Sequence, residues 1–333
     1  MNSVAVVTGA TGQDGSYLVE FLLDKNYTVF CIVRRTTYLI QNSNLSPISL
    51  NNTKCKIYDA DITDKSSLVK VFTDAEKFDR IEVYNLAAQS HVGTSFDCPT
   101  MTVEINTIGT LNMLEAVRQT CTLRKVRFYQ ASTSEMFGKV QTVPQNEKTS
   151  FYPRSPYGVA KLAAHWMVIN YRETYDLFAC CGILFNHESP RRGVNFVTQK
   201  VVKALKTPKP YLEIGNIESK RDWGHAKDYI KAMWLMLQQD EPDDYVVSSG
   251  EQHSVREFIE LTCKELGINL TWVGSGVDEL GVDTETRRTI VEVSEKFYRP
   301  CEVDTLLGDS SKVRKLGWKP EYTFEQLIKN MCE

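Results

Sequence analysis

Short apolar runs alternate with amphipathic stretches along the first half of the chain. Between the runs, apolar residues recur at helical intervals over 14–25, 64–76 and 100–120. Strands and helices that alternate in this way predict a parallel sheet with helices on both faces. The runs that we expect to form the strands are VAVVT (4–8), TVFCIVR (28–34), KCKIYDAD (54–61), IEVYNLA (81–87) and VRFYQAS (126–132).

The pattern becomes less regular in the second half. A long helix is expected over 158–175 and a strand over 178–186, followed by polar loops between shorter helices. The run DDYVVSSG (243–250) predicts a strand that returns to the first sheet. The expected fold class is therefore α/β, with a doubly wound parallel sheet formed mainly by 1–186 and a smaller, interleaved α/β domain formed mainly by 187–333.

Three glycines lie between the first expected strand and the first expected helix. In VVTGATGQDGSYLVEFLL, Gly9, Gly12 and Gly15 have the spacing G-x-x-G-x-x-G. Glycine allows the backbone to turn tightly and to approach a pyrophosphate, while the following helix N-terminus offers N–H groups and a positive dipole. The alternative is an ordinary tight turn. In an alternating α/β chain, the spacing predicts a dinucleotide site of the Rossmann type.

The end of the second expected strand bears on which dinucleotide binds. An NAD site usually has an acidic residue here for the ribose 2′-hydroxyl, whereas this chain has Arg34 and Arg35. Two guanidinium groups suit a 2′-phosphate and cannot accept a hydrogen bond from a hydroxyl. The pair predicts NADP, with two solvated arginines at a strand end as the alternative.

Composition excludes several classes of function. The net charge is −3, so general electrostatic attraction to nucleic acid or an anionic membrane is not expected. Nine scattered cysteines without a C-x-x-C pair, and no apolar stretch of about 18 residues, predict a reduced cytoplasmic protein. His91 and His225 have no partners at metal-ligand spacing, so no metal site is expected.

Two residues suited to acid–base chemistry lie at the start of the helix expected over 158–175. Tyr157 and Lys161 are four positions apart, so they share one helix face. A tyrosine with a pKa near 10 is a poor base at neutral pH. A lysine cation about 4 Å away would be worth on the order of 4 kcal/mol and would bring the pKa of the phenol toward neutrality. The alternative is a surface tyrosine and lysine.

Together with the glycine motif, this pair resembles the extended short-chain dehydrogenase/reductase superfamily. The resemblance implies that Tyr157 removes the proton of a sugar hydroxyl and that Lys161 also binds the nicotinamide ribose. Thr133 occupies the position commonly held by Ser or Thr in that superfamily. It would hydrogen-bond the same sugar oxygen.

Glu135 has no role in a plain dehydrogenase. Oxidation of a hexose at carbon 4 acidifies the proton on carbon 5, and a carboxylate could then remove that proton while the carbon 6 hydroxyl leaves as water. The hydride would return to carbon 6, with no net use of NADP. Glu135 would serve as base and then as acid. The alternative is a helix-capping or ion-paired glutamate.

The whole chain resembles the GDP-mannose 4,6-dehydratase family, whose motifs match both expected domains. The resemblance implies conversion of GDP-D-mannose to GDP-4-dehydro-6-deoxy-D-mannose in GDP-deoxyhexose (fucose or rhamnose) biosynthesis. Some members also reduce this product to GDP-rhamnose with NADPH. The matching stretches include GATGQDGSYL, VYNLAAQSHVG, QASTSEMFG, FYPRSPYGVAK, GILFNHESPRRG, NFVTQK, KRDWGHAKDYI, AMWLMLQQ and YRPCEVD.

The resemblance also implies binding residues, which are carried over position by position. The NADP positions are Gly9, Thr11, Gly12, Gln13, Asp14, Gly15, Arg34, Arg35, Asp61, Ile62, Leu86, Ala87, Ala88, Gln89, Ser90, Tyr157, Lys161, His187 and Arg192. The GDP-mannose positions are Ser90, Thr133, Glu135, Asn186, Lys200, Gly215, Lys220, Arg221, Arg299 and Glu302. Read without the resemblance, the charged residues Lys200, Lys220, Arg221, Arg299 and Glu302 favour solvated surface groups, and the match to family motifs favours binding for Arg221, Arg299 and Glu302.

Ser134, as in the GDP-mannose family, stands where dehydratases acting on dTDP-glucose have an Asp thought to act as acid, so Glu135 is expected to handle both proton transfers. Two features depart from the family pattern. Met101 replaces a tyrosine found in many members. The segment 36–44 differs from the family loop that reaches a neighbouring subunit's cofactor. The expected assembly is a homodimer through the helices at 100–120 and 158–175, with a homotetramer as the alternative.

Two rival functions remain open from the sequence. A net oxidoreductase or epimerase of the same superfamily would keep Tyr157 and Lys161 but would not need Glu135. A non-catalytic nucleotide sensor would need none of the three side chains.

Overall fold

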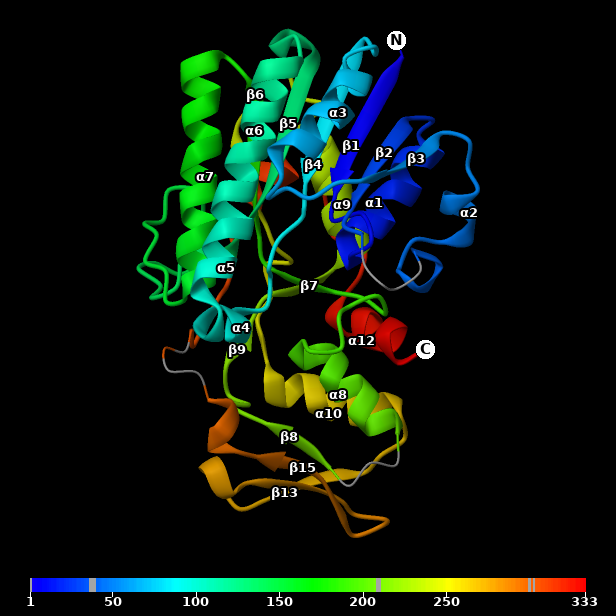
Figure 1. The fold of residues 1–333 in the computed structure, drawn as a ribbon. Coiled ribbons are helices and arrows are strands. Elements are labelled where there is room, and N and C mark those ends of the chain that lie inside the picture. Colours follow the sequence, from blue (N-terminus) through cyan, green and yellow to red (C-terminus); the bar gives the residue numbers. More distant parts are fainter. Residues whose placement is uncertain (1, 36–39, 208–210, 299–300, 302) are drawn as a thin grey trace.

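The computed structural model describes residues 2–35, 40–207, 211–298, 301 and 303–333. Its main feature is one sheet of seven parallel strands in the order β11-β6-β5-β4-β1-β2-β3 (Figure 1). The strands are β1 (Ser3–Thr8), β2 (Thr28–Val33), β3 (Cys55–Asp59), β4 (Arg80–Asn85), β5 (Val126–Thr133), β6 (Phe178–Leu184) and β11 (Asp244–Val247). The order reverses at β1, as in a doubly wound Rossmann fold. The expected α/β fold class is confirmed.

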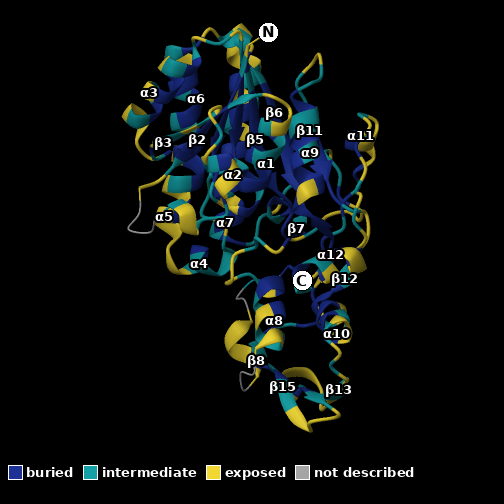
Figure 2. Ribbon diagram, turned by 90° about the vertical axis from the view of Figure 1, so that its right-hand side faces the viewer, coloured by how far each residue is buried: buried dark blue, intermediate teal, exposed yellow. Residues whose placement is uncertain are grey.

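Successive residues of β1 serve two separate cores, because side chains alternate across a strand. Val4 and Val6 pack beneath α3 (Lys65–Ala75), α6 (Gly109–Thr120) and α7 (Pro156–Tyr175). Ala5 and Val7 pack beneath α1 (Gln13–Asp24) and α9 (Ala226–Met236) on the other face. Both faces are therefore covered, and the central strands are buried while exposed positions lie on the surrounding helices and loops (Figure 2).

A smaller body lies at the carboxyl end of the large sheet (Figure 1). It contains a four-stranded sheet in the order β13-β14-β15-β8, with strands Leu270–Val273, Leu280–Asp283, Arg288–Val293 and Leu212–Ile214. Three helices form a third core with it. These are α8 (Val197–Lys206), α10 (Val255–Glu265) and α12 (Phe324–Cys332).

Residues from the second half of the chain return to the large body. Strand β11 pairs with β6, and α9 packs against α1. Two short strand pairs lie between the bodies: β7 (Asn186–Glu188) with β10 (Trp223–His225), and β9 (Lys220–Arg221) with β12 (His253–Ser254).

The helix expected over 100–120 is interrupted. Helix α5 (Pro99–Val103) continues into a π-helical segment, Glu104–Ile108, before α6 begins. A further helix, α4 (Val92–Asp97), precedes it and was not expected from the apolar pattern. The π segment matters for the site because Asn106, within it, hydrogen-bonds the loop after β4.

Candidate active site

One cavity of about 1130 Å³ extends from the carboxyl ends of the large sheet's strands to the smaller body. This is where parallel α/β sheets bind their ligands. Every position expected to bind NADP lines this cavity except Arg35, which lines a second pocket beside it. Of the positions expected to bind GDP-mannose, some line this cavity and others do not.

The turn between β1 and α1 is shaped by glycine. Gly9 has a φ of +65°, and a Cβ there would come within 3.0 Å of the Ala87 nitrogen. A Cβ on Gly15 would lie 2.2 Å from the Gly9 carbonyl oxygen. Gly12 precedes the first turn of α1, and no side chain caps that turn. The first N–H groups of the helix therefore face the cavity, which suits a diphosphate.

The first turn of α1 also carries an acidic residue that is paired with a buried histidine. Asp14 Oδ2 lies 2.8 Å from His187 Nε2, and the other ring nitrogen lies 2.7 Å from the Phe185 carbonyl oxygen. Burial alone would raise the pKa of Asp14, but the charge and hydrogen bond of His187 outweigh it and lower that pKa. The same pairing raises the pKa of His187 against the effect of burial.

The loop after β4 is held from both sides. Thr8 Oγ1 accepts hydrogen bonds from the backbone N–H groups of Leu86 and Ala87, at 3.0 and 2.9 Å. Asn106 accepts from the Gln89 N–H and donates to the Gln89 carbonyl oxygen. The expected cofactor residues Leu86, Ala87, Ala88, Gln89 and Ser90 are thus fixed at the cavity wall.

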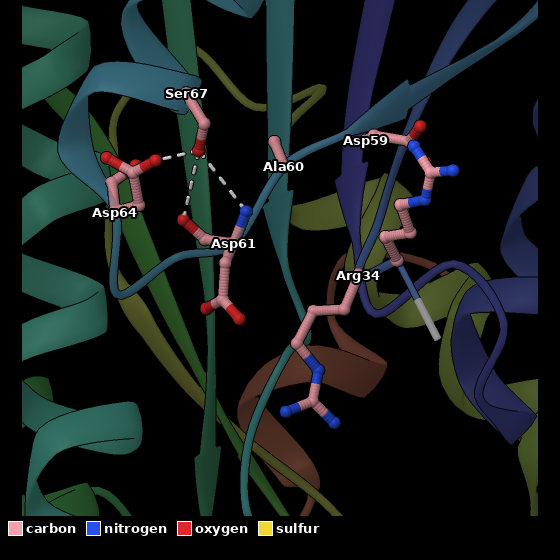
Figure 3. A pocket seen from close by; sticks show the side chains of 7 residues that line it. Arg34, Asp59, Ala60, Asp61, Asp64 and Ser67 are labelled. Carbon is pink, nitrogen blue, oxygen red and sulfur yellow. Dashed lines mark hydrogen bonds between the residues drawn. The ribbon is translucent and has the colours of Figure 1, made fainter. Parts of the chain in front are cut away.

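The second pocket lies at the ends of β2 and β3. Arg34, Arg35 and Asp61 line it together with Ser67, whose hydroxyl donates to the Asp64 carbonyl oxygen at 2.8 Å (Figure 3). The side chains of Arg34 and Asp61 extend in the same direction in this view. Arg34 lines the main cavity as well, so it connects the two spaces.

The four expected catalytic residues meet where β5 and α7 face the cavity. Strand β5 ends at Thr133, whose side chain is close enough to Tyr157 to lower the pKa of its phenol. Ser155 caps α7 by accepting from the Gly158 N–H, so Tyr157 lies in the first turn and Lys161 one turn later. Glu135 is half-buried, and its N–H donates to Thr133 Oγ1 at 3.2 Å.

The expected lowering of the tyrosine pKa is not found. Burial raises the pKa of Tyr157 to about 12, although the Thr133 hydrogen bond works against it. Glu135 raises that pKa further and Arg192 lowers it. Burial also lowers the pKa of Lys161 to about 8. Burial is the largest cause of both shifts, and Lys161 is not among the groups that shift the pKa of Tyr157, so the attraction that the spacing predicted does not lower it.

The substrate positions separate into three groups. Ser90, Asn186, Gly215 and Lys200 line the cavity, as does Arg221. The Lys200 ammonium donates to the Glu213 carbonyl oxygen at 2.6 Å and lies over the Phe297 ring. Lys220 is exposed and does not line the cavity, because its side chain leaves the opposite side of β9 from that of Arg221. Arg299 and Glu302 lie outside the described residues.

Sequence reasoning overlooked several residues of the cavity wall. Trp223, Phe297 and Tyr298 line the substrate end. Trp223 lies within KRDWGH and Tyr298 within YRPCEVD, while Phe297 immediately precedes the latter motif, so the sequence signal lay at or next to motifs already indicated. Apolar and aromatic walls around a few polar groups are usual for ligand pockets.

Within 2–35, 40–207, 211–298, 301 and 303–333, no group of three or more His, Cys, Asp and Glu side chains could hold a metal ion. The helices in that part of the chain are all too short or too polar to cross a bilayer.

The seven-stranded parallel sheet, the glycine turn and the Thr133, Tyr157 and Lys161 cluster define an extended short-chain dehydrogenase/reductase fold. A dTDP-glucose 4,6-dehydratase from Streptomyces venezuelae has this fold, with a TM-score of 0.82, 22% identity and coverage of 99% of this chain and 95% of that one. So does a UDP-glucose 4-epimerase from Thermotoga maritima, with a TM-score of 0.81, 21% identity and coverage of 99% and 97%.

Sequence comparison identifies the family. The family model for GDP-mannose 4,6 dehydratase matches residues 6–331. The GDP-mannose 4,6 dehydratase of Drosophila melanogaster is 52% identical to this chain, and the match covers 100% of this chain and 86% of the relative. The one from Homo sapiens is 50% identical, and the match covers 99% of this chain and 90% of the relative. The one from Vibrio cholerae is 49% identical, over 98% and 92%. The chain belongs to the GDP-mannose 4,6-dehydratase family.

Proposed function

We propose that this protein is a hydro-lyase that converts GDP-D-mannose to GDP-4-dehydro-6-deoxy-D-mannose. The observation that carries the proposal is the carboxyl group of Glu135, which lines the same cavity as Tyr157 and Thr133 and acts electrostatically on the phenol. A dehydrogenase or epimerase needs only Tyr157, Thr133 and a lysine. A 4,6-dehydratase needs an additional base for carbon 5. Family membership supports the same substrate.

The cavity fits a nicotinamide dinucleotide. Steric crowding at Gly9 and Gly15 excludes side chains, and the open N-terminus of α1 offers donors to a diphosphate. Arg34 at the junction of the two pockets supports NADP, because a guanidinium binds a 2′-phosphate well. When bound, the oxidised nicotinamide supplies a positive charge and a hydride acceptor, so the hydride that leaves carbon 4 can return to carbon 6.

Tyr157 is the base for the carbon 4 hydroxyl. Thr133, which lines the cavity beside Tyr157, can bond the same sugar oxygen and keep it next to the phenol. The buried tyrosine needs nearby positive charge to ionise, because its pKa is about 12. Lys161 supplies a cation when protonated, and Arg192 already acts in the same direction.

Glu135 then carries out the elimination. The new carbonyl at carbon 4 acidifies the carbon 5 proton, which the carboxylate removes. The same carboxyl group returns this proton to the departing carbon 6 hydroxyl, which leaves as water. The proton that Tyr157 took in the first step balances the proton that carbon 5 receives when the product is completed.

Residues of the smaller body are proposed to hold the GDP group. Arg221 is buried at the cavity wall, where a guanidinium can pair with a diphosphate. Asn186 lines the cavity two residues after Leu184, which pairs with Thr133, and itself pairs with Trp223, so it lies between the catalytic end and the strand that follows Arg221. Arg299 and Glu302 are assigned to the nucleoside from family resemblance alone. In this division, residues 1–186 bind mainly the dinucleotide and residues 187–333 mainly the sugar nucleotide.

A homodimer is proposed from one outer surface of the large body. Val103 and Ile108 from the α5–α6 region, and Val159 and Trp166 from α7, are all at least 40% exposed. Large apolar side chains gathered on one surface indicate an interface. The nine free cysteine thiols favour a reducing compartment, so we propose the cytoplasm as the site of action.

The direct test is incubation of the purified protein with GDP-mannose and NADP. Mass spectrometry should detect a product that has lost one water, with no net accumulation of NADPH. NADPH formed in proportion to product, or a product of unchanged mass, would indicate an oxidoreductase or an epimerase instead.

A further inference from the structure

A buried histidine contacts the strand that carries the catalytic threonine but faces away from the reacting groups. His165 Nδ1 lies 3.0 Å from the hydroxyl oxygen of Ser132. Both side chains are 3% exposed. Ser132 immediately precedes Thr133 in β5, and His165 lies one helical turn after Lys161 in α7. His165 does not line the cavity.

The imidazole is neutral and its ring is held in place. Burial lowers its pKa, while Asp244 raises it and Arg172 lowers it. Those two charged residues are themselves paired, with Arg172 Nη1 3.2 Å from Asp244 Oδ2. Phe151 packs edge-on to the imidazole with ring centroids 5.4 Å apart. The ring therefore presents Nδ1 to Ser132 in one orientation.

Two consecutive residues of β5 thus act on one helix at two points. The Thr133 side chain lowers the pKa of Tyr157 in the first turn of α7, and Ser132 pairs with His165 two turns further along. The catalytic set is divided between these two elements, since Thr133 and Glu135 come from β5 and its continuation, whereas Tyr157 and Lys161 come from α7. Backbone pairing with β6 extends to Thr133, whose partner is Leu184, and the contact between Ser132 and His165 adds a side-chain link from the end of β5 to α7.

We propose that His165 is a positioning residue that holds Ser132, and through it Thr133 and Glu135, in register with Tyr157 and Lys161. The expected effect on turnover rests on the proposed function, whereas the structural role of His165 does not. Misplacement of a reacting group by about 1 Å can cost about 100-fold in rate without loss of substrate binding.

Three substitutions at this position separate a polar role from packing. The amide of His165→Asn places a polar atom near the site of Nδ1, that of His165→Gln places one near Nε2, and His165→Phe keeps only the ring. We expect kcat to fall about 10- to 100-fold in the Phe and Gln variants, with KM within about twofold, and to recover to within about threefold of wild type in the Asn variant. The pH values at which kcat changes should not move.

Two controls accompany this series. Tyr171→Phe removes a hydrogen bond from the same helix to Glu115, outside the cavity, and should leave kcat unchanged. The double variant Ser132→Ala with His165→Phe should be no slower than the slower single variant, because both remove one interaction. Equal losses in the Asn, Gln and Phe variants, or multiplicative losses in the double variant, would overturn the proposal.

A second measurement does not depend on turnover. In His165→Phe, the amide of Glu135, which bonds Thr133 Oγ1, should exchange with solvent hydrogen at least tenfold faster than in wild type. The Asn variant should restore slow exchange. Unchanged exchange in the Phe variant would contradict the positioning role even if the wild-type protein failed to turn over GDP-mannose, whereas that failure alone would contradict only the proposed function.

Discussion

Asp14 at the first turn of α1 is paired with the buried imidazole of His187, Oδ2 to Nε2 at 2.8 Å. A carboxylate beside a dinucleotide turn would repel a diphosphate if it were unpaired. The histidine neutralises it, and a second hydrogen bond from the imidazole to the Phe185 carbonyl oxygen fixes the ring. The protein thereby joins the first helix of the large sheet to β7, between the two bodies.

This pair should make stability depend on pH. The folded pKa of His187 is raised, so its contribution is present below about pH 6.5 and is lost as pH rises through the folded pKa. The folded pKa of Asp14 is lowered, so its contribution is present above about pH 4 and is lost as pH falls through the folded pKa. His187→Gln should therefore lower the free energy of unfolding by about 2 kcal/mol at pH 5.5 and by less at pH 9. Urea unfolding without dinucleotide measures the free energy of unfolding at both pH values. A loss of stability that does not depend on pH would show that only packing against Tyr229 was removed.

Lys161 should cost stability at neutral pH. Its pKa is lowered by burial to about 8, so the unfolded chain binds a proton more tightly between about pH 8 and 10.5. Lys161→Met should raise the free energy of unfolding by about 3 kcal/mol at pH 7, with the gain shrinking as pH rises toward 10.5. The same variant should lose turnover. Lys70→Met, on the exposed surface of α3, is the matched control and should show no pH-dependent gain. A destabilised Lys161→Met at pH 7 would refute the argument.

Glu135 should be needed for elimination and not for folding. Glu135→Gln keeps the shape and the hydrogen-bonding atoms but cannot accept a proton, so kcat for water loss should fall by about 10³-fold, within the range for a general base. The melting temperature should stay close to that of wild type, because the side chain is only half-buried. Glu104→Gln, exposed on the π-helical segment, provides the control and should retain wild-type kcat. Near-normal turnover by Glu135→Gln would point to an epimerase or reductase.

Arg34 should decide between NADP and NAD. Removal of a charge-assisted bond to the 2′-phosphate by Arg34→Ala should raise the Kd for NADP about 10- to 100-fold and leave the Kd for NAD unchanged. Arg35→Ala should have the smaller effect, since Arg35 lines only the side pocket. Titration calorimetry with both dinucleotides measures this. Equal weakening of both, or tighter binding of NAD by the wild-type protein, would argue against the 2′-phosphate role.

The large sheet could be predicted because its strands are buried on both faces. Such strands are continuous apolar runs, and the runs from Val4 to Ser132 coincide with β1 to β5 within about two residues. The small sheet could not be predicted in this way. Strand β13, Leu270–Val273, is half-exposed to exposed throughout, and β15 pairs with β8 from a much earlier part of the chain. Short, partly exposed strands carry little local signal.

The site shows the same limit. The spacing of Tyr157 and Lys161 predicted a shared helix face, because that relation is local. Their pKa values depend on how deeply the folded protein buries them, and here burial reverses the expected direction for Tyr157. The contact between Ser132 and His165 joins a strand and a helix 33 positions apart. No periodicity in the sequence indicates it.

The most direct test of the account is the fate of the hydrogen on carbon 4 of the sugar. GDP-mannose deuterated at carbon 4 should be converted to a 4-keto-6-deoxy product that carries the deuterium on carbon 6. The result should be the same in a single turnover and over many turnovers of the bound dinucleotide. Nuclear magnetic resonance of the product locates the label. Deuterium lost to solvent, or recovered in free NADPH, would contradict an elimination enclosed between Tyr157 and Glu135.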